Sequence, residues 1–221
     1  MTPTREQAAA GQAVYTPRML RLYDLIVLGV SNRFIWKCPT SRLLRLYNDN
    51  VSANHLDVGV GTGYYLDRCR FPIEQPQITL LDMNANCLQA AAARISRYSP
   101  TCYEGNIFEP LNLNGAKFDS ISLNYVLHCL PGTMPDKLVA VKRLAELLTP
   151  GGVLFGSTLL YGGVPRSWPA RRLMDFYNRK QIFTNVDDDL NTLQAGCAAI
   201  FETSEIEAVG CAALMCCRNA R

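Results

Sequence analysis

The stretch Leu56-Asp57-Val58-Gly59-Val60-Gly61-Thr62-Gly63-Tyr64 decides the fold of this chain of 221 residues. It joins an apolar run, which predicts a strand over His55–Val60, to a helical pattern over Tyr64–Cys69. Its three glycines let the backbone turn tightly and approach a ligand to a distance that a β-carbon would forbid. The alternative is that these glycines only close a tight turn between a strand and a helix.

Short apolar runs alternate with longer helical patterns on the C-terminal side of this stretch. Such alternation is typical of a parallel sheet flanked by helices. The strands are expected at His55–Val60, Gln77–Asp82, Cys102–Gly105, Phe118–Leu123 and Gly152–Ser157. The helices between them are expected at Tyr64–Cys69, Cys87–Arg97, Tyr125–Leu130 and Met134–Leu148.

The last third of the chain predicts two helices and a β-hairpin, at Pro169–Tyr177, Asp187–Ala199 and Ser204–Cys217. Three acids open the second helix, where they favour the positive end of the helix dipole. No metal site is expected there, because adjacent helical residues do not converge on one ion. The fold class is therefore α/β, with a Rossmann-like, doubly wound, seven-stranded sheet whose last two strands form a hairpin.

Residues 1–221 are expected to form a single domain, since one hydrophobic core can serve a chain of this length. Within it, residues 51–221 are the Rossmann-like core. Residues 1–50 are a helical cap, because apolar residues recur at helical intervals between Gln12 and Tyr47 and predict two or three helices.

Composition and charge narrow the function classes. The 22 basic and 19 acidic residues are spread along the chain without a basic run, which argues against nucleic acid as a partner. The nine cysteines form no C-x-x-C pair and are predicted to be reduced thiols. No stretch approaches the ~20 apolar residues of a membrane span and no signal sequence opens the chain, so we expect a cytoplasmic monomer or homodimer without stable membrane insertion.

Two acids indicate which nucleotide the glycine loop holds. Asp82 ends the second strand about twenty residues after the glycines, where a carboxylate can accept both ribose hydroxyls. Asp57 precedes the glycines, where a carboxylate would repel a pyrophosphate but would favour the ammonium and sulfonium groups of S-adenosylmethionine. The spacing of the three glycines also differs from the dinucleotide pattern G-x-G-x-x-G, which argues against an NAD-dependent reductase.

The successive motifs resemble those of class I S-adenosylmethionine-dependent methyltransferases. They are Asp57-x-Gly59-x-Gly61-x-Gly63, Asp82, Gly105-Asn106-Ile107, and Phe118-Asp119 through Val126-Leu127-His128. The resemblance implies that Asp57 lies near the methionine amino group, that the glycines face the methionyl and ribose parts, and that Asp82 binds the ribose hydroxyls. It also implies that Met83 packs on the adenine.

Many members of this family carry an acid after the third strand to bind the adenine amine, whereas this chain has Asn106 there. An amide oxygen can still accept that hydrogen bond. The residues expected to bind the cofactor S-adenosyl-L-methionine are Asp57, Gly59, Gly61, Gly63, Asp82, Met83, Asn106, Ile107 and Asn124.

A second resemblance concerns the cap. Leu22-Tyr23-Asp24-Leu25, Ser31 and Trp36-Lys37 are similar to the opening of quinone-biosynthesis C-methyltransferases. In such enzymes the N-terminal helices cover the cofactor and help shape the substrate pocket, and the resemblance implies the covering role for residues around Tyr15, Tyr23, Arg33 and Trp36. Aromatic residues between Thr158 and Val186 would form its far wall. The residues expected to bind substrate are Tyr15, Tyr23, Trp36, Tyr161 and Tyr177. The alternative for the cap is an aromatic stripe that packs on the sheet.

His128 is the candidate catalytic residue, because it follows the fourth strand at the edge where substrate would lie and its pKa range suits a general base. The alternative is a histidine that packs or forms hydrogen bonds beside the helix.

The sequence thus predicts a methyltransferase acting on a small-molecule acceptor, with O-methylation of an aromatic or polyketide-type enol hydroxyl ahead of C-methylation of a quinone-like acceptor. One alternative keeps the cofactor but catalyses a cyclisation or rearrangement. Another is a non-catalytic binding module that retains the fold alone.

Overall fold

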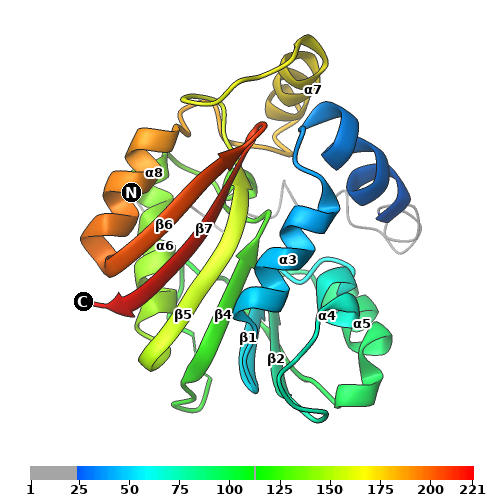
Figure 1. Cartoon of the computed structure of the whole chain (residues 1–221), viewed down its shortest axis with the longest axis vertical. Coiled ribbons are helices and arrows are strands. Elements are labelled where there is room, and N and C mark those ends of the chain that lie inside the picture. Colours follow the sequence, from blue (N-terminus) through cyan, green and yellow to red (C-terminus); the bar gives the residue numbers. More distant parts are fainter. Residues whose placement is uncertain (1–23, 112) are drawn as a thin grey trace.

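A computed structural model describes residues 24–111 and 113–221, and its centre is a seven-stranded mixed sheet (Figure 1). The order across the sheet is β3-β2-β1-β4-β5-β7-β6. Strands β1 to β5 run parallel, and β7 lies antiparallel between β5 and β6. The predicted fold class is confirmed. The bounds are β1 (Asn54–Val58), β2 (Gln77–Asp82), β3 (Thr101–Glu104), β4 (Phe118–Asn124), β5 (Leu148–Leu159), β6 (Phe201–Val209) and β7 (Ala212–Ala220).

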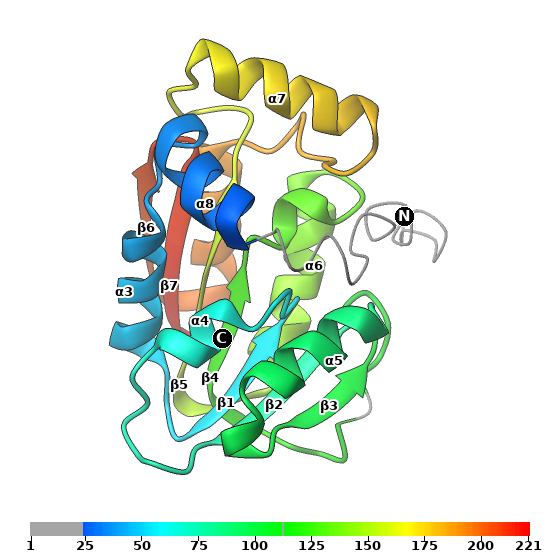
Figure 2. The same ribbon diagram turned by 90° about the vertical axis from the view of Figure 1, so that its right-hand side faces the viewer.

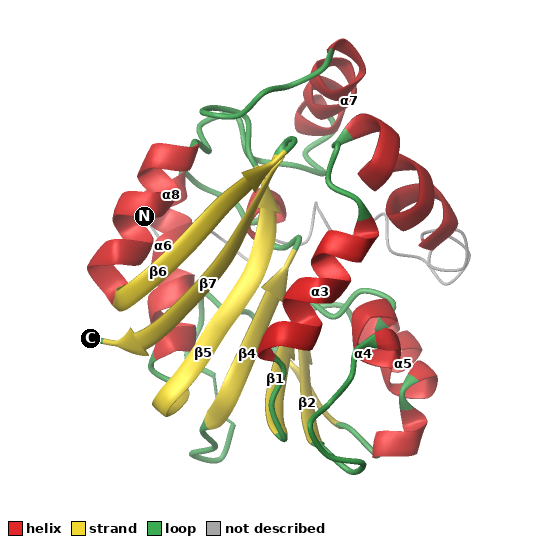
Figure 3. Ribbon diagram, viewed as in Figure 1, coloured by secondary structure: helices red, strands yellow, loops and turns green. Residues whose placement is uncertain are grey.

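Helices cover both faces of the sheet (Figure 3). Helices α3, α4 and α5 pack on one face, and α6 and α8 pack on the other, each with its own cluster of buried apolar residues. Helix α7 lies beyond the end of the sheet, on the same side as the π-helical segment η1 (Figure 2). The bounds are η1 (Asp24–Ile35), α3 (Thr40–Asn50), α4 (Tyr64–Arg68), α5 (Ala85–Arg94), η2 (Ser96–Tyr98), η3 (Leu127–Cys129), α6 (Met134–Ala145), α7 (Trp168–Arg179) and α8 (Leu190–Ile200).

The order of strands reverses between β1 and β4, because the chain winds outward to β3 on one side and to β5 on the other. In such sheets the loops at the carboxyl ends of the two central strands separate and leave a crevice. The ligand site predicted from the glycine loop therefore belongs at the carboxyl ends of β1 and β4.

Helix α6 begins at Met134, as the sequence predicts. Asp136 Oδ2 accepts a hydrogen bond from the backbone N–H of Thr133 at 2.9 Å, and Pro135 lies in the first turn, where its missing N–H has no intrahelical partner to lose. Its apolar stripe, which includes Leu138, Val141 and Leu144, is buried against the sheet.

The prediction of a helix over Tyr125–Leu130 is wrong, since only the single turn η3 forms there. The backbone N–H of Tyr125 bonds to Ser157 O of β5 at 2.7 Å, which prolongs the sheet by one residue, and Tyr125 then takes φ +57°. A residue inside a right-handed helix must have negative φ, so a helix cannot include Tyr125 and the chain turns sharply instead.

Other boundaries also differ from the prediction, and two of these differences have an identifiable cause. Strand β5 begins at Leu148 rather than Gly152, because an irregularity in its pairing with β4 accommodates Pro150 and Gly151. Helix α8 begins at Leu190 rather than Asp187, because the side chain of Asp189 caps it by accepting from the backbone N–H of Thr192 at 3.0 Å.

The described part of the cap contains η1 and α3, whereas Tyr15 and Tyr23 lie outside the described residues.

All nine cysteines lie in the described part and are free thiols, as predicted. Across residues 24–111 and 113–221, every helix is too short or too polar to cross a bilayer.

Candidate functional site

A cavity opens at the carboxyl ends of β1, β2 and β4, where the strand order reverses. The glycine loop forms its floor, and helices η1 and α3 close it from the cap side. The lining residues are Leu28, Tyr47, Asp57, 59–65, 82–84, Cys87, Asn106, Phe108, 124–126 and 129–131.

The three glycines of the loop all have positive φ, but they serve different contacts. A β-carbon on Gly59 (φ +70°) would lie 2.3 Å from Val126 Cγ2, and one on Gly63 (φ +70°) would lie 3.0 Å from Ala91 Cα. Gly59 and Gly63 therefore let the loop pack against the end of β4 and against α5. A β-carbon on Gly61 (φ +52°) would meet no atom within 4 Å, so Gly61 leaves space for a ligand.

Asp57 lines the cavity at the end of β1 and is 4% exposed. Its Oδ1 accepts hydrogen bonds from the Tyr47 hydroxyl at 2.9 Å and from the Ser122 hydroxyl. Burial raises the pKa of Asp57 to about 6, and these two hydrogen bonds act against that rise.

Asp82 lines the cavity at the end of β2, and its Oδ1 accepts from the backbone N–H of Asn84 at 2.8 Å. Burial raises its pKa to about 6, although backbone hydrogen bonds, led by that of Asn84, lower it. Within the described residues, neither Asp57 nor Asp82 forms an ion pair with Lys or Arg. A buried carboxylate and a half-buried one, both without a cationic partner, suit a ligand that brings a positive charge and hydroxyl donors.

The remaining predicted cofactor residues divide into two groups. Met83, Asn106 and Asn124 line the cavity, whereas Ile107 is buried in the apolar cluster beneath α6. Asn106 Oδ1 accepts from the backbone N–H of Phe108 at 3.0 Å, which fixes the amide at the end of the cavity. A carbonyl oxygen retains a second lone pair for a ligand donor.

His128 is 3% exposed and does not line this cavity. Its Nδ1 accepts from the backbone N–H of Leu159 at 3.3 Å, and its ring packs edge-on against Phe183 with centroids 4.4 Å apart. Burial, aided by the charge of Lys137, lowers its pKa to about 3. A neutral imidazole that accepts at Nδ1 carries its proton on Nε2, so in this state neither nitrogen has a free lone pair for a base.

The other predicted aromatic residues of the described part do not line the cavity either, and two of them belong to the aromatic cluster around this histidine. Trp36 and Tyr177 pack against Phe183 with centroids 6.2 and 4.8 Å apart. The Tyr161 hydroxyl donates to Asp175 Oδ1 at 2.9 Å, and Arg166 stacks on its ring. The substrate-binding role of Trp36, Tyr161 and Tyr177 stays a prediction.

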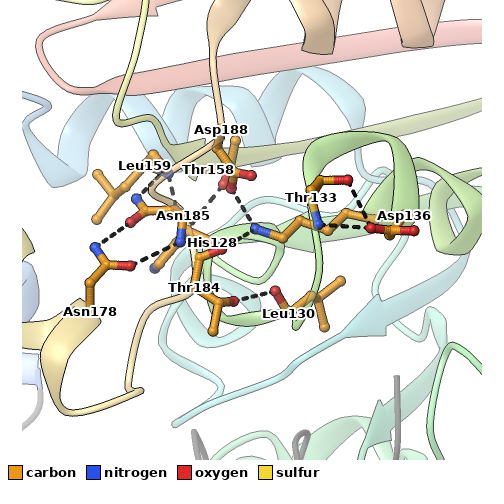
Figure 4. Close-up of polar contacts among 11 residues, drawn as sticks. His128, Leu130, Thr133, Asp136, Thr158, Leu159, Asn178, Thr184, Asn185 and Asp188 are labelled. Atoms are coloured by element: carbon orange, nitrogen blue, oxygen red, sulfur yellow. Dashed lines mark hydrogen bonds and ion pairs between the residues drawn. The ribbon is translucent and has the colours of Figure 1, made fainter. Parts of the chain in front are cut away.

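Sequence reasoning missed a buried ion pair that joins α6 to the segment before α8 (Figure 4). Lys137 Nζ lies 2.6 Å from Asp188 Oδ2 and donates to Thr184 O at 2.8 Å, and both charged side chains are 0% exposed. One signal was present, because Lys137 lies on the apolar stripe of its helix, four residues before Val141 and seven before Leu144.

A network around this pair holds the segment Thr184–Asp188 against η3 and the end of β5 (Figure 4). The backbone N–H of Thr184 donates to His128 O at 2.9 Å, and Asn185 Nδ2 donates to Leu159 O at 2.9 Å. These contacts connect the segment to η3, β5 and α6 and fix the surroundings of His128.

Tyr125 was also missed as a site residue. It lines the cavity, it takes a left-handed backbone conformation that few side chains adopt, and its ring centroid lies 5.7 Å from that of His128. It thus stands between the cavity and the aromatic cluster around His128.

Comparisons with known proteins agree with this geometry. A family model described as "Methyltransferase domain" matches residues 56–154, which include the glycine loop and both acids. The demethylluteothin O-methyltransferase of Streptomyces thioluteus is 39% identical, over 93% of this chain and 90% of that protein. The chain belongs to the class I S-adenosylmethionine-dependent methyltransferases.

Other relatives of this methyltransferase extend the comparison. The physcion biosynthesis cluster O-methyltransferase of Aspergillus chevalieri is 35% identical, over 95% of this chain and 93% of that protein. A solved structure with a similar fold is that of the N-methyltransferase NodS from Bradyrhizobium japonicum WM9 in complex with S-adenosylhomocysteine. It superposes on this chain with a TM-score of 0.66 at 17% sequence identity, and the match covers 99% of this chain and 100% of that chain. This last likeness shows the fold.

Proposed function

We propose that this chain transfers the methyl group of S-adenosylmethionine to a hydroxyl oxygen of a small aromatic or polyketide-type enol acceptor. The observation that carries the proposal is the similarity, over nearly the whole chain, to relatives named O-methyltransferases. A cytoplasmic compartment and a monomeric or homodimeric state stay predictions from the sequence.

The residues that line the cavity suit the chemical groups of the cofactor. We assign Asp82 to the ribose hydroxyls and Asp57 to the methionine ammonium group. The loop at Gly61 would face the methionyl and ribose parts of the cofactor. Met83 and Asn106 would contact the adenine, and Asn124 lines the same cavity. The bound cofactor supplies a methyl group on a sulfonium.

The chain's own contribution to the reaction is alignment and exclusion of water. Methyl transfer proceeds once the acceptor oxygen, the methyl carbon and the sulfur are held in line, so positioning supplies much of the rate. His128 is neutral, its Nδ1 accepts a hydrogen bond from Leu159, and its Nε2 carries the proton. We therefore assign it a structural role beside the acceptor. An acidic enol or phenol would then react as its own anion.

The test is incubation of the purified protein with S-adenosylmethionine and a panel of hydroxypyrones and phenolic polyketides, followed by mass spectrometry and NMR. The proposal predicts a mass gain of one CH₂ with a methoxy signal, and one S-adenosylhomocysteine formed per product. A methyl group on carbon, or a rearranged product without an added methyl group, would overturn it. A variant Asp82→Ala serves as the matched control for cofactor-dependent turnover.

A further inference from the structure

A row of buried polar side chains lies beneath the cofactor cavity, on one face of the two central strands. His55 and Asp57 of β1 pair in register with Ser120 and Ser122 of β4. Alternate residues of a strand share a face, so these four side chains point the same way, and each is at most 4% exposed. Central parallel strands are normally apolar on both faces, so this row requires an explanation.

The row is connected by hydrogen bonds from end to end. Ser120 Oγ lies 2.7 Å from His55 Nδ1, His55 Nε2 lies 3.0 Å from Ser122 Oγ, and the Ser122 hydroxyl donates to Asp57 Oδ1. The Tyr47 hydroxyl of α3 donates to the same Oδ1 at 2.9 Å.

The number of hydrogens available in the row allows its hydrogen bonds to run in only one direction. An ionised Asp57 can only accept, so the single hydrogen of the Ser122 hydroxyl is used on it. Ser122 Oγ must then accept from His55 Nε2–H, which leaves the lone pair of His55 Nδ1 to accept from Ser120. The Ser120 oxygen accepts from the backbone N–H of Ser52 at 2.9 Å. Every donor therefore points toward Asp57.

We propose that Tyr47, Ser122 and His55 are positioning residues that hold Asp57 as an anion and aim its second oxygen at the ammonium group of the cofactor's methionine part. This inference rests on the proposed function, because it requires S-adenosylmethionine in the cavity. Among the described residues no group donates to Asp57 Oδ2, while Asp57 borders the cavity.

The electrostatic surroundings of Asp57 explain why such support is needed. Burial raises its pKa, and the charge of Asp82 on β2 raises it further, whereas the donors Ser122 and Tyr47 lower it. Tyr65 of α4 stacks on Tyr47 with centroids 5.0 Å apart, and the remaining facing group is the thiol of Cys69, so the described neighbours supply no cation. Loss of one donor moves the pKa of Asp57 toward neutrality.

His55 can serve as a fixed donor because it does not titrate near neutral pH. Burial lowers its pKa to about 3, so the ring stays neutral and keeps one N–H. A protonated ring would donate at both nitrogens and would break the direction of the row at Ser120.

Two ligands separate this role from general damage. S-adenosylhomocysteine carries the ammonium group, whereas 5′-methylthioadenosine shares the adenosine and sulfur but lacks the amino acid. Both would be titrated calorimetrically into the wild type, Ser122→Ala and Tyr47→Phe between about pH 5 and 8. We expect each variant to lose roughly tenfold or more in affinity for S-adenosylhomocysteine at neutral pH. In each variant, the affinity for S-adenosylhomocysteine should level off at a higher pH than in the wild type. The affinity for methylthioadenosine should not change.

A matched pair at His55 tests the direction of the row. His55→Gln offers an amide N–H to Ser122 and a carbonyl to Ser120, so it should retain most of the affinity for S-adenosylhomocysteine, whereas His55→Leu should lose it. Equal losses for both ligands, or unchanged S-adenosylhomocysteine binding in Ser122→Ala and Tyr47→Phe, would overturn the inference. Failure of the wild type to bind either ligand would instead overturn the proposed function itself.

Discussion

Replacing Lys137 by methionine should be among the most destabilising single substitutions in this chain. The side chain is 0% exposed, and its ammonium group contacts only Asp188 Oδ2 and Thr184 O among the described residues (Figure 4). Methionine fills a similar volume without a charge. Asp188 would remain buried, and since its Oδ1 already has no hydrogen-bond partner in the described structure, both oxygens would then lack one.

Breaking a buried pair in this way costs about 3–5 kcal/mol, because it leaves one uncompensated charge. For a chain of this size such a loss lowers the melting temperature by about 6–20 °C. Burial raises the pKa of Asp188 to about 6 and lowers the pKa of Lys137, so desolvation outweighs the attraction between them. The double variant Lys137→Met/Asp188→Leu should therefore recover the lost stability and reach or exceed that of the wild type.

Urea unfolding of the wild type, both single variants and the double variant forms a complete mutant cycle. Lys142→Met is the matched control, since Lys142 lies exposed on the same helix, and it should change stability by less than about 0.5 kcal/mol. A loss below about 1 kcal/mol in Lys137→Met would show that the charge left on Asp188 is not costly, and a double variant no more stable than the single variants would show the same.

Four further predictions concern the site. Asp82→Ala should weaken S-adenosylhomocysteine binding by about 1.5–3 kcal/mol in calorimetry, and unchanged affinity would remove the ribose assignment. Gly61→Ala should weaken binding and lower the melting temperature only by the strain of alanine at φ +52°. Gly59→Ala should lower the melting temperature further, because its β-carbon would also lie 2.3 Å from a neighbouring methyl carbon, and the reverse order would contradict this assignment. Affinity for S-adenosylhomocysteine should fall as the pH drops through about 6, because Asp57 and Asp82 must be ionised to receive the ligand. The fall should reach roughly tenfold per pH unit for each carboxylate. An affinity that does not change between about pH 5 and 7 would exclude these pKa values. His128→Asn should leave the shape of the pH–rate profile with a phenolic acceptor unchanged, and loss of its acidic limb would restore the role of a base.

The sheet could be predicted because its signals are local. Each central strand is a short stretch with alternating or continuous apolar residues, and β2 begins and ends at the predicted residues Gln77 and Asp82. The glycine spacing and the two acids likewise lie within a short stretch of chain, so the floor of the cavity follows from the sequence.

The other side of the site could not be predicted because its contacts join distant segments. Lys137 and Asp188 are 51 residues apart, and the acid lies in a run of three that looks like an ordinary helix start. Tyr125 looked helical from its neighbours, but a single hydrogen bond to β5 decided its conformation. Pairing of this kind depends on tertiary structure rather than on local pattern.

The hydrogen-bonded row beneath Asp57 was partly visible in the sequence. Ser120 and Ser122 alternate within an otherwise apolar strand, and His55 stands two residues before the acid. Their common face could be inferred from the strand period, but their register across β1 and β4 comes only from the assembled sheet.

Calorimetric titration of the purified protein with S-adenosylmethionine and with S-adenosylhomocysteine measures directly whether the cavity binds the cofactor and its product. The cavity and its two carboxylates predict micromolar binding of both ligands at neutral pH, with one site per chain. If a protein that unfolds cooperatively on heating bound neither ligand, the assignment of this cavity as a cofactor site would be wrong.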